Sequence, residues 1–235
     1  MHISFNGVIK PYTYNCPYAY KLRNIDKIYP EDVLPKEEPA EEEEVSKRTF
    51  GIEQHDLAAR YIQGEDVEFN FSTDTIELLR NNTDVEVEKT EYFDLNYCLL
   101  PSRPSSGDYI SKRCDAVLRT PYTVGVFDLK FGNPDYGQTI YYDETDFFVM
   151  LEAFARPDYS EWRTEVHFPI HDYSLPTREY NYHRMSRLQQ RYMMRIDRIM
   201  NDKFCKPEPS TAHCRFCDYR SIESGGCGVC EHSIL

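Results

Sequence analysis

Two carboxylates and a lysine lie at the ends of two neighbouring predicted strands. Asp115 is near the start of a strand predicted over 114–119, and Asp128 and Lys130 stand at the end of the strand predicted over 124–129. Because side chains two residues apart in a strand point to one face, we expect Asp128 and Lys130 to share a face. Carboxylate oxygens can hold Mg²⁺ or Mn²⁺, and a lysine beside them can neutralise a phosphate or orient a water. The competing interpretation is a salt-bridged strand face without a metal.

Clustered cysteines near the C-terminus form a second candidate site. Two pairs with C-x₂-C spacing follow each other after a gap of nine residues: Cys214 with Cys217, and Cys227 with Cys230. The first ten residues lack the pattern of a secretory signal, so we expect a reducing cytoplasm, where clustered thiols bind metal before they form disulfides. Taken alone, two such pairs predict a zinc site with four thiolate ligands.

Composition and charge narrow the class of protein. The chain has 235 residues, of which 40% are hydrophobic, 29% charged and 14% aromatic, which is a globular profile. No apolar run approaches the roughly 20 residues that span a bilayer, so we expect no membrane association. The net charge of −13 disfavours a nucleic-acid partner at first sight. However, residues 31–45 alone carry −7, whereas residues 183–203 carry +4, so local charge decides.

The elements that must position these residues follow from hydrophobic periodicity. Apolar spacing of three and four predicts helices, and alternation predicts strands in an antiparallel meander. Helices are expected over 16–22, 47–64, 75–79, 138–155 and 181–203, and strands within 85–100 and over 114–119, 124–129 and 164–170. A run of prolines and glutamates predicts a solvated loop over 31–46.

A row of arginines follows one face of the helix predicted over 181–203. Arg184, Arg187, Arg191, Arg195 and Arg198 recur at intervals of three and four, beside an apolar face with the same spacing. Two interpretations remain open, a solvated helix face and a surface that follows the phosphates of DNA. For the second, Arg187, Arg191 and Arg195 are the candidate DNA-binding residues.

The order of the polar motifs resembles one nuclease family. The chain carries Gly51-xxx-His55, then Asp115, then Asp128-Leu129-Lys130, then Gln138-xxx-Tyr142. This series resembles the RecB-like branch of the PD-(D/E)XK nuclease superfamily, with Asp128 where glutamate is commoner. The resemblance implies a restriction-endonuclease-like α/β core, in which helices flank a mixed sheet.

That resemblance also implies roles for individual residues. His55, Asp115, Asp128 and the backbone carbonyl of Leu129 would hold one or two Mg²⁺ or Mn²⁺ ions, and Lys130 would act in catalysis with the two aspartates. Gln138 and Tyr142 match the motif that helps to position DNA or the lysine. The expected activity is that of a metal-dependent deoxyribonuclease, more narrowly an exonuclease (EC class 3.1), on DNA ends or single strands.

The cysteines acquire a second meaning from the resemblance. Similar CRISPR-associated and phage exonucleases carry a [4Fe–4S] cluster whose first cysteine precedes the core and whose other three close the chain. Cys16, which stands before Pro17, matches the first ligand, and Cys214 and Cys217 match two of the others. For the fourth we favour Cys227, with Cys230 as alternate and Cys205 as a weaker choice. Zn²⁺ remains the alternative occupant.

Together these expectations describe a single nuclease domain over residues 1–235. It would consist of an N-terminal segment (1–30) with the first cluster cysteine, an acidic loop (31–46), a core (47–204) and a cysteine-rich tail (205–235). The setting would be the cytoplasm of a prokaryote or of a phage-infected cell, in recombination, replication or repair, with a protein of those processes as a partner. The rival hypotheses are a non-catalytic DNA- or partner-binding protein with this fold, and a zinc-bound interaction module.

Overall fold

The computed structural model describes most of the chain. Described are residues 2–29, 42–135, 137–202, and the single residues Cys205, Cys214, Cys217, Tyr219, Val229, Cys230 and His232. Their contacts form two compact units, one of Met1–His2 and Glu42–Tyr192, the other of Ile3–Glu41 and Met193–Leu235. The expectation of one nuclease domain over the whole chain stays a prediction.

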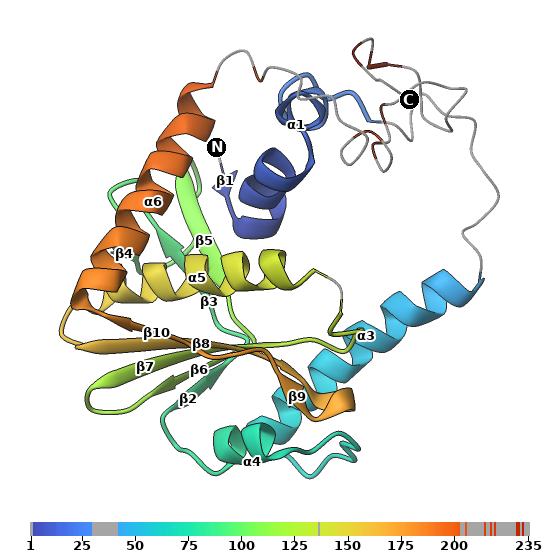
Figure 1. Cartoon of the computed structure of the whole chain (residues 1–235), viewed down its shortest axis with the longest axis vertical. Coiled ribbons are helices and arrows are strands. Elements are labelled where there is room, and N and C mark those ends of the chain that lie inside the picture. Colours follow the sequence, from blue (N-terminus) through green and yellow to red (C-terminus); the bar gives the residue numbers. More distant parts are fainter. Residues whose placement is uncertain are drawn as a thin grey trace. The chain divides into compact units, whose positions relative to one another are not determined.

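The first unit is a mixed α/β structure with two sheets (Figure 1). One sheet has the strand order β1-β5-β3-β4, and the other β10-β8-β7-β6-β2, with β9 paired to β8. The strands are β1 (His2–Ile3), β2 (Val85–Val87), β3 (Thr90–Phe93), β4 (Leu99–Leu100), β5 (Tyr109–Arg113), β6 (Ala116–Arg119), β7 (Thr123–Leu129), β8 (Glu161–Phe168), β9 (Tyr173–Ser174) and β10 (Arg178–Asn181).

Helices supply the other layers of this unit. They are α3 (Glu42–Ile62), α4 (Asp74–Arg80), α5 (Gln138–Ala155), the short 3₁₀ turn η3 (Pro169–His171) and α6 (Tyr182–Asn201), whose last residues, from Met193, belong to the second unit. No helix within the described ranges is long and apolar enough to cross a bilayer.

The sheet with the order β10-β8-β7-β6-β2 is the central sheet of this unit. It follows the sequence pattern with one addition. β6 and β7 pair antiparallel, as the meander predicts, whereas β7 and β8 pair parallel, with α5 as the crossover between them. A parallel pair needs such a long connection, and the helix predicted over 138–155 supplies it. The mixed sheet with flanking helices is therefore confirmed.

The two faces of this sheet have different covers. Phe127 and Leu129 of β7 pack with Ala58 of α3 and Leu79 of α4 in one buried cluster. Because side chains alternate along a strand, Asp128 points away from that cluster. α5 packs against β7 and β8 and also contacts β5 (Figure 1). Asp128 thus stands between an apolar cluster on one side and α5 on the other.

Helix α3 begins earlier than the sequence pattern predicts. The pattern places residues 31–46 in a loop, whereas α3 already begins at Glu42. Glutamate is a good helix former, and negative charge in the first turn is favourable beside the exposed backbone N–H groups. The predicted stop is confirmed, because α3 ends at Ile62 and Gly64 has a φ of 87°.

The second unit contains the N-terminal elements. Two π-helical turns, η1 (Phe5–Ile9) and η2 (Pro11–Asn15), precede α1 (Pro17–Asn24), which starts on a proline as the sequence predicts. Leu22 of α1 and Tyr219 form a small buried cluster, against which Cys217, Val229 and Cys230 pack. Residues close to both ends of the chain therefore share one small core.

Candidate metal-dependent active site

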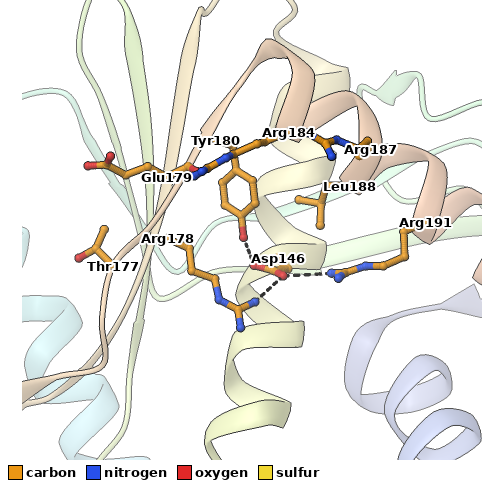
Figure 2. A pocket seen from close by; sticks show the side chains of 9 residues that line it. All are labelled: Asp146, Thr177, Arg178, Glu179, Tyr180, Arg184, Arg187, Leu188 and Arg191. Carbon is orange, nitrogen blue, oxygen red and sulfur yellow. Dashed lines mark hydrogen bonds and ion pairs between the residues drawn. The ribbon is translucent and has the colours of Figure 1, made fainter.

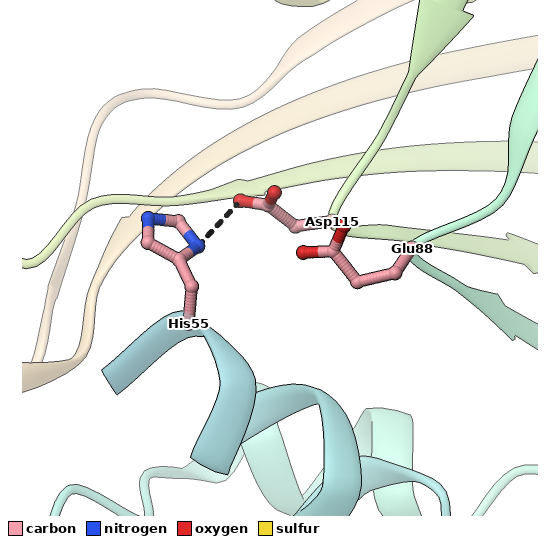
Figure 3. Close-up of side chains that lie close together, drawn as sticks. All are labelled: His55, Glu88 and Asp115. Atoms are coloured by element: carbon pink, nitrogen blue, oxygen red, sulfur yellow. Dashed lines mark ion pairs between the residues drawn. The ribbon is translucent and has the colours of Figure 1, made fainter. Parts of the chain in front are cut away.

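One imidazole and two carboxylates converge at one end of the central sheet (Figure 3). They belong to His55 on α3, Glu88 after β2 and Asp115 before β6, and one ligand atom of each lies within 4.8 Å of the others. His55 Nδ1 lies 3.6 Å from Asp115 Oδ2. His55 also meets Phe131 edge-on, with 5.0 Å between ring centroids, which restricts the orientation of the imidazole. The structure thus brings together His55 and Asp115, which the sequence placed 60 residues apart.

Hydrogen bonds hold Glu88 and Asp115 in place, and the Glu88 carboxylate also accepts from Arg113 Nε at 2.5 Å. Asp115 lies where the chain passes from β5 in one sheet to β6 in the other, and Glu88 lies at the reverse passage from β2 to β3. The N–H of Glu88 donates to the carbonyl oxygen of Asp115 at 3.0 Å. The N–H of Leu129 donates to Asp115 Oδ2 at 2.6 Å. The carboxylate of Asp115 is therefore anchored to the end of β7, next to Asp128.

Lys130 is held between two acids. Its Nζ lies 2.8 Å from Oδ1 of Asp128 and 3.4 Å from Oε2 of Glu144 on α5. Its backbone N–H donates to the carbonyl of His167 on β8 at 2.8 Å, which fixes the chain just after β7. Asp128 and Glu144 are both buried. The predicted common face of Asp128 and Lys130 is thus present, with Glu144 as an additional partner.

The charges of the site shift its pKa values in opposite directions. Burial, together with Glu88 and Glu144 nearby, raises the pKa of Asp115 to about 7 against the effect of Lys130. Burial also raises the pKa of Asp128 well above its usual range. Burial and then Lys130 lower the pKa of His55, so its imidazole is neutral at neutral pH. Carboxylates crowded in this way favour a bound cation.

The donor set fits a hard divalent cation. Among the residues that the structure describes, Oδ2 of Asp128 is buried without a hydrogen-bond partner, which is costly unless something positive approaches it. Carboxylate oxygens with one neutral imidazole suit Mg²⁺ or Mn²⁺. His55, Glu88 and Asp115 are the residues that could hold such an ion.

The two residues of the last motif lie at the start of α5. Gln138 is exposed and its Nε2 donates to the carbonyl of Pro134 at 2.9 Å. Tyr142 donates through its hydroxyl to the carbonyl of Pro176 at 2.9 Å. The ring beneath Lys130 is that of Tyr141, 5.1 Å from Nζ, because one residue along a helix turns the side chain by about 100°. Among the described residues, Gln138 and Tyr142 have these carbonyls as partners rather than Lys130.

Sequence reasoning missed Glu88 and Glu144. Glu88 follows a three-residue strand at a φ of 53°, so it stands outside any periodic pattern. Glu144 carried a usable signal, because it belongs to a group of acids in the otherwise apolar helix over 138–155. An acid on the buried face of a helix needs a partner, and the partner of Glu144 is Lys130.

The three arginines proposed for DNA lie in different surroundings. Arg191 Nη2 lies 3.0 Å from Oδ2 of Asp146, so its charge is partly used inside the protein. Arg187 is exposed and lines a cavity in the first unit. Arg195 belongs to the second unit. The three arginines, which the helical spacing places in one row, therefore have three different surroundings.

Four of the cysteines lie close together in the second unit. Burial raises the pKa of the Cys217 thiol, and the neighbouring thiols of Cys230, Cys16 and Cys214 raise it further. The N–H of Cys217 donates to the carbonyl of Cys214 at 3.1 Å, and that of Cys230 to the carbonyl of Tyr219 at 2.8 Å. No disulfide joins the cysteines that are described. Cys227, the favoured fourth ligand, lies outside the described residues.

Comparison with known proteins gives distant likenesses only. No family model matches the chain, and no curated protein matches it. Among solved structures, the protein SSO0001 superposes with a TM-score of 0.49 at 12% identity, over 100% of this chain and 88% of the other. A candidate exonuclease from Eubacterium rectale superposes with a TM-score of 0.46 at 11% identity, over 92% of this chain and 86% of the other.

Proposed function

We propose that the protein is a metal-dependent nuclease that hydrolyses phosphodiester bonds in DNA. One observation carries this proposal, namely that His55, Glu88 and Asp115 converge beside the ion pair of buried Asp128 and half-buried Lys130. A divalent cation held there would lower the pKa of a water and stabilise negative charge on the scissile phosphate. Asp128, whose Oδ2 has no hydrogen-bond partner among the described residues, would complete the set of ligands with the carbonyl of Leu129.

The side chains around the ion have separate tasks in this proposal. Neutral His55 offers a lone pair, since its pKa is lowered. Lys130 stays protonated because Asp128 and Glu144 outweigh the effect of its burial and raise its pKa. Its ammonium group can therefore neutralise a phosphate or orient a water, while Glu144 keeps it at the end of β7. Gln138 and Tyr142 remain proposed positioning residues at the start of α5.

The proposed substrate is a DNA end or a single strand, which makes the activity that of an exonuclease. Arg187, Arg191 and Arg195 are proposed to contact the phosphates of that DNA. Processing of DNA ends belongs to recombination, replication or repair, and a protein of those processes is the expected partner. These finer assignments rest on the motif resemblance in the sequence.

A metal cluster is proposed for the thiols of the second unit. A [4Fe–4S] cluster requires four thiolates, and the thiols of Cys16, Cys214 and Cys230 lie close enough to Cys217 to raise its pKa. Their proximity supports Cys230 as a ligand beside the other three, while Cys227, the candidate that the sequence favours, lies outside the described residues. Zn²⁺ is the alternative occupant, because it also takes four thiolates. Either metal would join α1 to the C-terminal residues.

The test of the nuclease proposal is direct. Purified protein would be incubated with end-labelled single- and double-stranded DNA, with Mg²⁺, with Mn²⁺ and with chelator. We expect loss of the label only with a divalent cation, and loss of that activity in Asp128→Asn. Circular single-stranded DNA would remain intact if the enzyme requires an end. A folded protein that binds DNA but leaves every substrate intact would instead be the non-catalytic member of the rival hypothesis.

A further inference from the structure

A cavity of about 530 Å³ lies beside α5, β10 and the first turns of α6, entirely within the first unit. Its walls carry four guanidinium groups, in contrast to the net charge of −13 for the whole chain. The arginines are Arg178, Arg184, Arg187 and Arg191, and the acids beside them are Asp146 and Glu179. Such a concentration of positive charge in a hollow attracts anions.

Asp146 lines the cavity, and its carboxylate accepts hydrogen bonds from three neighbouring side chains (Figure 2). Its carboxylate accepts from Arg178 Nη1 at 2.8 Å and from Arg191 Nη2 at 3.0 Å, and the Tyr180 hydroxyl donates to its other oxygen. Because Asp146 is only 1% exposed, these contacts are needed to compensate its buried charge. Arg178 and Arg191 therefore frame the cavity while part of their charge is used inside the protein.

The remaining two arginines form no ion pair with the described residues. Arg187 is exposed, and the described part of the chain gives it no ion pair or hydrogen bond. Among the described residues, the guanidinium of Arg184 donates only to the backbone carbonyl of Glu179, at 3.3 Å. A guanidinium group presents several N–H donors in a plane, which suits the oxygens of a phosphate. Arg184 and Arg187 lie three residues apart on α6, so both point to the same side of the helix.

We propose that this cavity is a binding subsite for the phosphates of a single nucleic-acid strand. The inference rests on the proposed nuclease function and extends it to a second place of contact with the substrate. A volume of this size suits a small group such as one nucleotide unit, whereas a duplex would need a wide open surface. The cavity is also connected to the start of α5, because the guanidinium of Arg178 lies 3.8 Å from the ring centre of Tyr142.

The test measures strand binding without cleavage. A fluorescent twelve-residue thymidine oligonucleotide would be titrated with protein in EDTA, and its anisotropy recorded over a range of salt concentrations. The variant is Arg184→Ala with Arg187→Ala, which leaves Asp146 and its two arginines intact. We expect binding at least about tenfold weaker, since each charge-assisted contact contributes about that much. The logarithmic salt dependence should flatten by about 0.7 for each lost contact.

Arg60→Ala is the matched control. Arg60 is an exposed arginine on α3 that contacts Asp56 and Glu65, so the substitution removes one positive charge outside the cavity, against two in the double variant. We expect the control to bind like the wild type, and a peptide nucleic acid of the same bases, which lacks phosphates, to bind to neither protein. Circular dichroism would verify that each variant is folded.

The outcomes are separable. Equal affinity and equal salt dependence of the double variant and the wild type would overturn the subsite. The subsite would also be overturned if the double variant bound pyrophosphate more weakly than the wild type but bound the oligonucleotide equally well. The ligand of the cavity would then be a free phosphate compound. Cleavage with Mn²⁺ is recorded separately with the wild type. A failure there would refute the nuclease function while the binding result in EDTA stands by itself.

Discussion

The backbone N–H of Glu88 donates to the carbonyl oxygen of Asp115, and the two residues mark the places where the chain passes between the two sheets. The hydrogen bond joins the segment that leads from β2 to β3 with the segment that leads back from β5 to β6. Its consequence is that two carboxylates reach the same point without either lying inside a strand. His55 approaches that point from α3. The candidate metal site is therefore built at the junction of the sheets.

Glu88→Gln should weaken metal binding. The substitution keeps the shape of the side chain and removes the charge from one of three converging groups. Residues that only hydrogen-bond to metal ligands contribute about 10- to 100-fold to metal affinity. Glu88 would be a ligand itself, so we expect at least about a tenfold higher dissociation constant for Mn²⁺. Titration calorimetry measures it directly. Glu65→Gln, an exposed acid that contacts Arg60, is the control; equal affinities of the two variants would remove Glu88 from the site.

Lys130→Ala should slow cleavage strongly while the protein still binds Mn²⁺. The substitution removes the ammonium group together with most of the methylene chain, and the loss of one group that stabilises developing charge lowers the rate by about 10²- to 10³-fold. Single-turnover cleavage of labelled DNA gives the rate, and calorimetry gives the metal affinity. His55→Ala is the comparison variant, because the loss of a metal ligand should weaken Mn²⁺ binding more than DNA binding. If Lys130→Ala cleaved at the wild-type rate, the lysine would have no role in catalysis.

The arrangement of the core was largely predictable, because it depends on local patterns. The helix over 138–155 coincides with α5, and the strand ending at residue 129 coincides with the end of β7. The strand β5 escaped prediction, because Tyr109–Arg113 contains Ser111 and Lys112 as buried residues and shows no alternation. Such a strand becomes recognisable only when the partners of its polar side chains are known.

The candidate site was predictable only where a motif marked it. Asp115, Asp128 and Lys130 could be named because their spacing on two strands has a chemical meaning. Glu88 could not, since a turn residue at positive φ has no periodic neighbours. The division of the arginines also needed the structure, because the spacing of Arg187 and Arg191 is the same whether or not Asp146 is beneath them.

Lys112→Met should destabilise the first unit strongly. Lys112 is buried and its ammonium forms ion pairs with Glu91, at 3.0 Å, and with Glu152. Removal of one partner from a buried ion pair typically costs about 3 to 5 kcal/mol, since the remaining charge stays buried. Urea unfolding near neutral pH measures the loss. Lys89→Met, which removes an exposed lysine that contacts Glu86 and, at 3.5 Å, the edge of the network at Glu91, should cost less than about 1 kcal/mol. Similar losses for both variants would show that the buried network contributes little.

The same network predicts a loss of stability in acid. Burial by itself would raise the pKa of Glu91, but Lys112 and Arg156 outweigh it and lower the pKa from 4.5 to about 2. A depressed pKa stabilises the folded state above the unfolded value, and this contribution disappears as the pH falls from 4.5 towards 2. The stability difference between wild type and Glu91→Gln should therefore shrink over this range. A difference that stays constant down to about pH 2 would contradict the shift.

Cys16→Ser should remove the metal of the second unit. Cys16 directly precedes α1, and its thiol is close enough to raise the pKa of Cys217, far away in the sequence. A cluster with four thiolate ligands loses most of its stability when one ligand becomes a hydroxyl, since iron and zinc prefer sulfur here. We expect the iron content per chain to fall sharply in Cys16→Ser and in Cys230→Ser. Elemental analysis of anaerobically purified protein measures iron and zinc together.

Cys205→Ser is the matched control for this measurement. The N–H of Cys205 and its thiol both contact Asp202, whereas the thiols that raise the pKa of Cys217 are those of Cys230, Cys16 and Cys214. Its substitution should leave the metal content unchanged and keep the C-terminal residues resistant to protease. In Cys16→Ser the same residues should be cleaved faster, because the metal no longer joins them to α1. Full metal content in Cys16→Ser would mean that the C-terminal cysteines bind their metal alone, as a zinc site would.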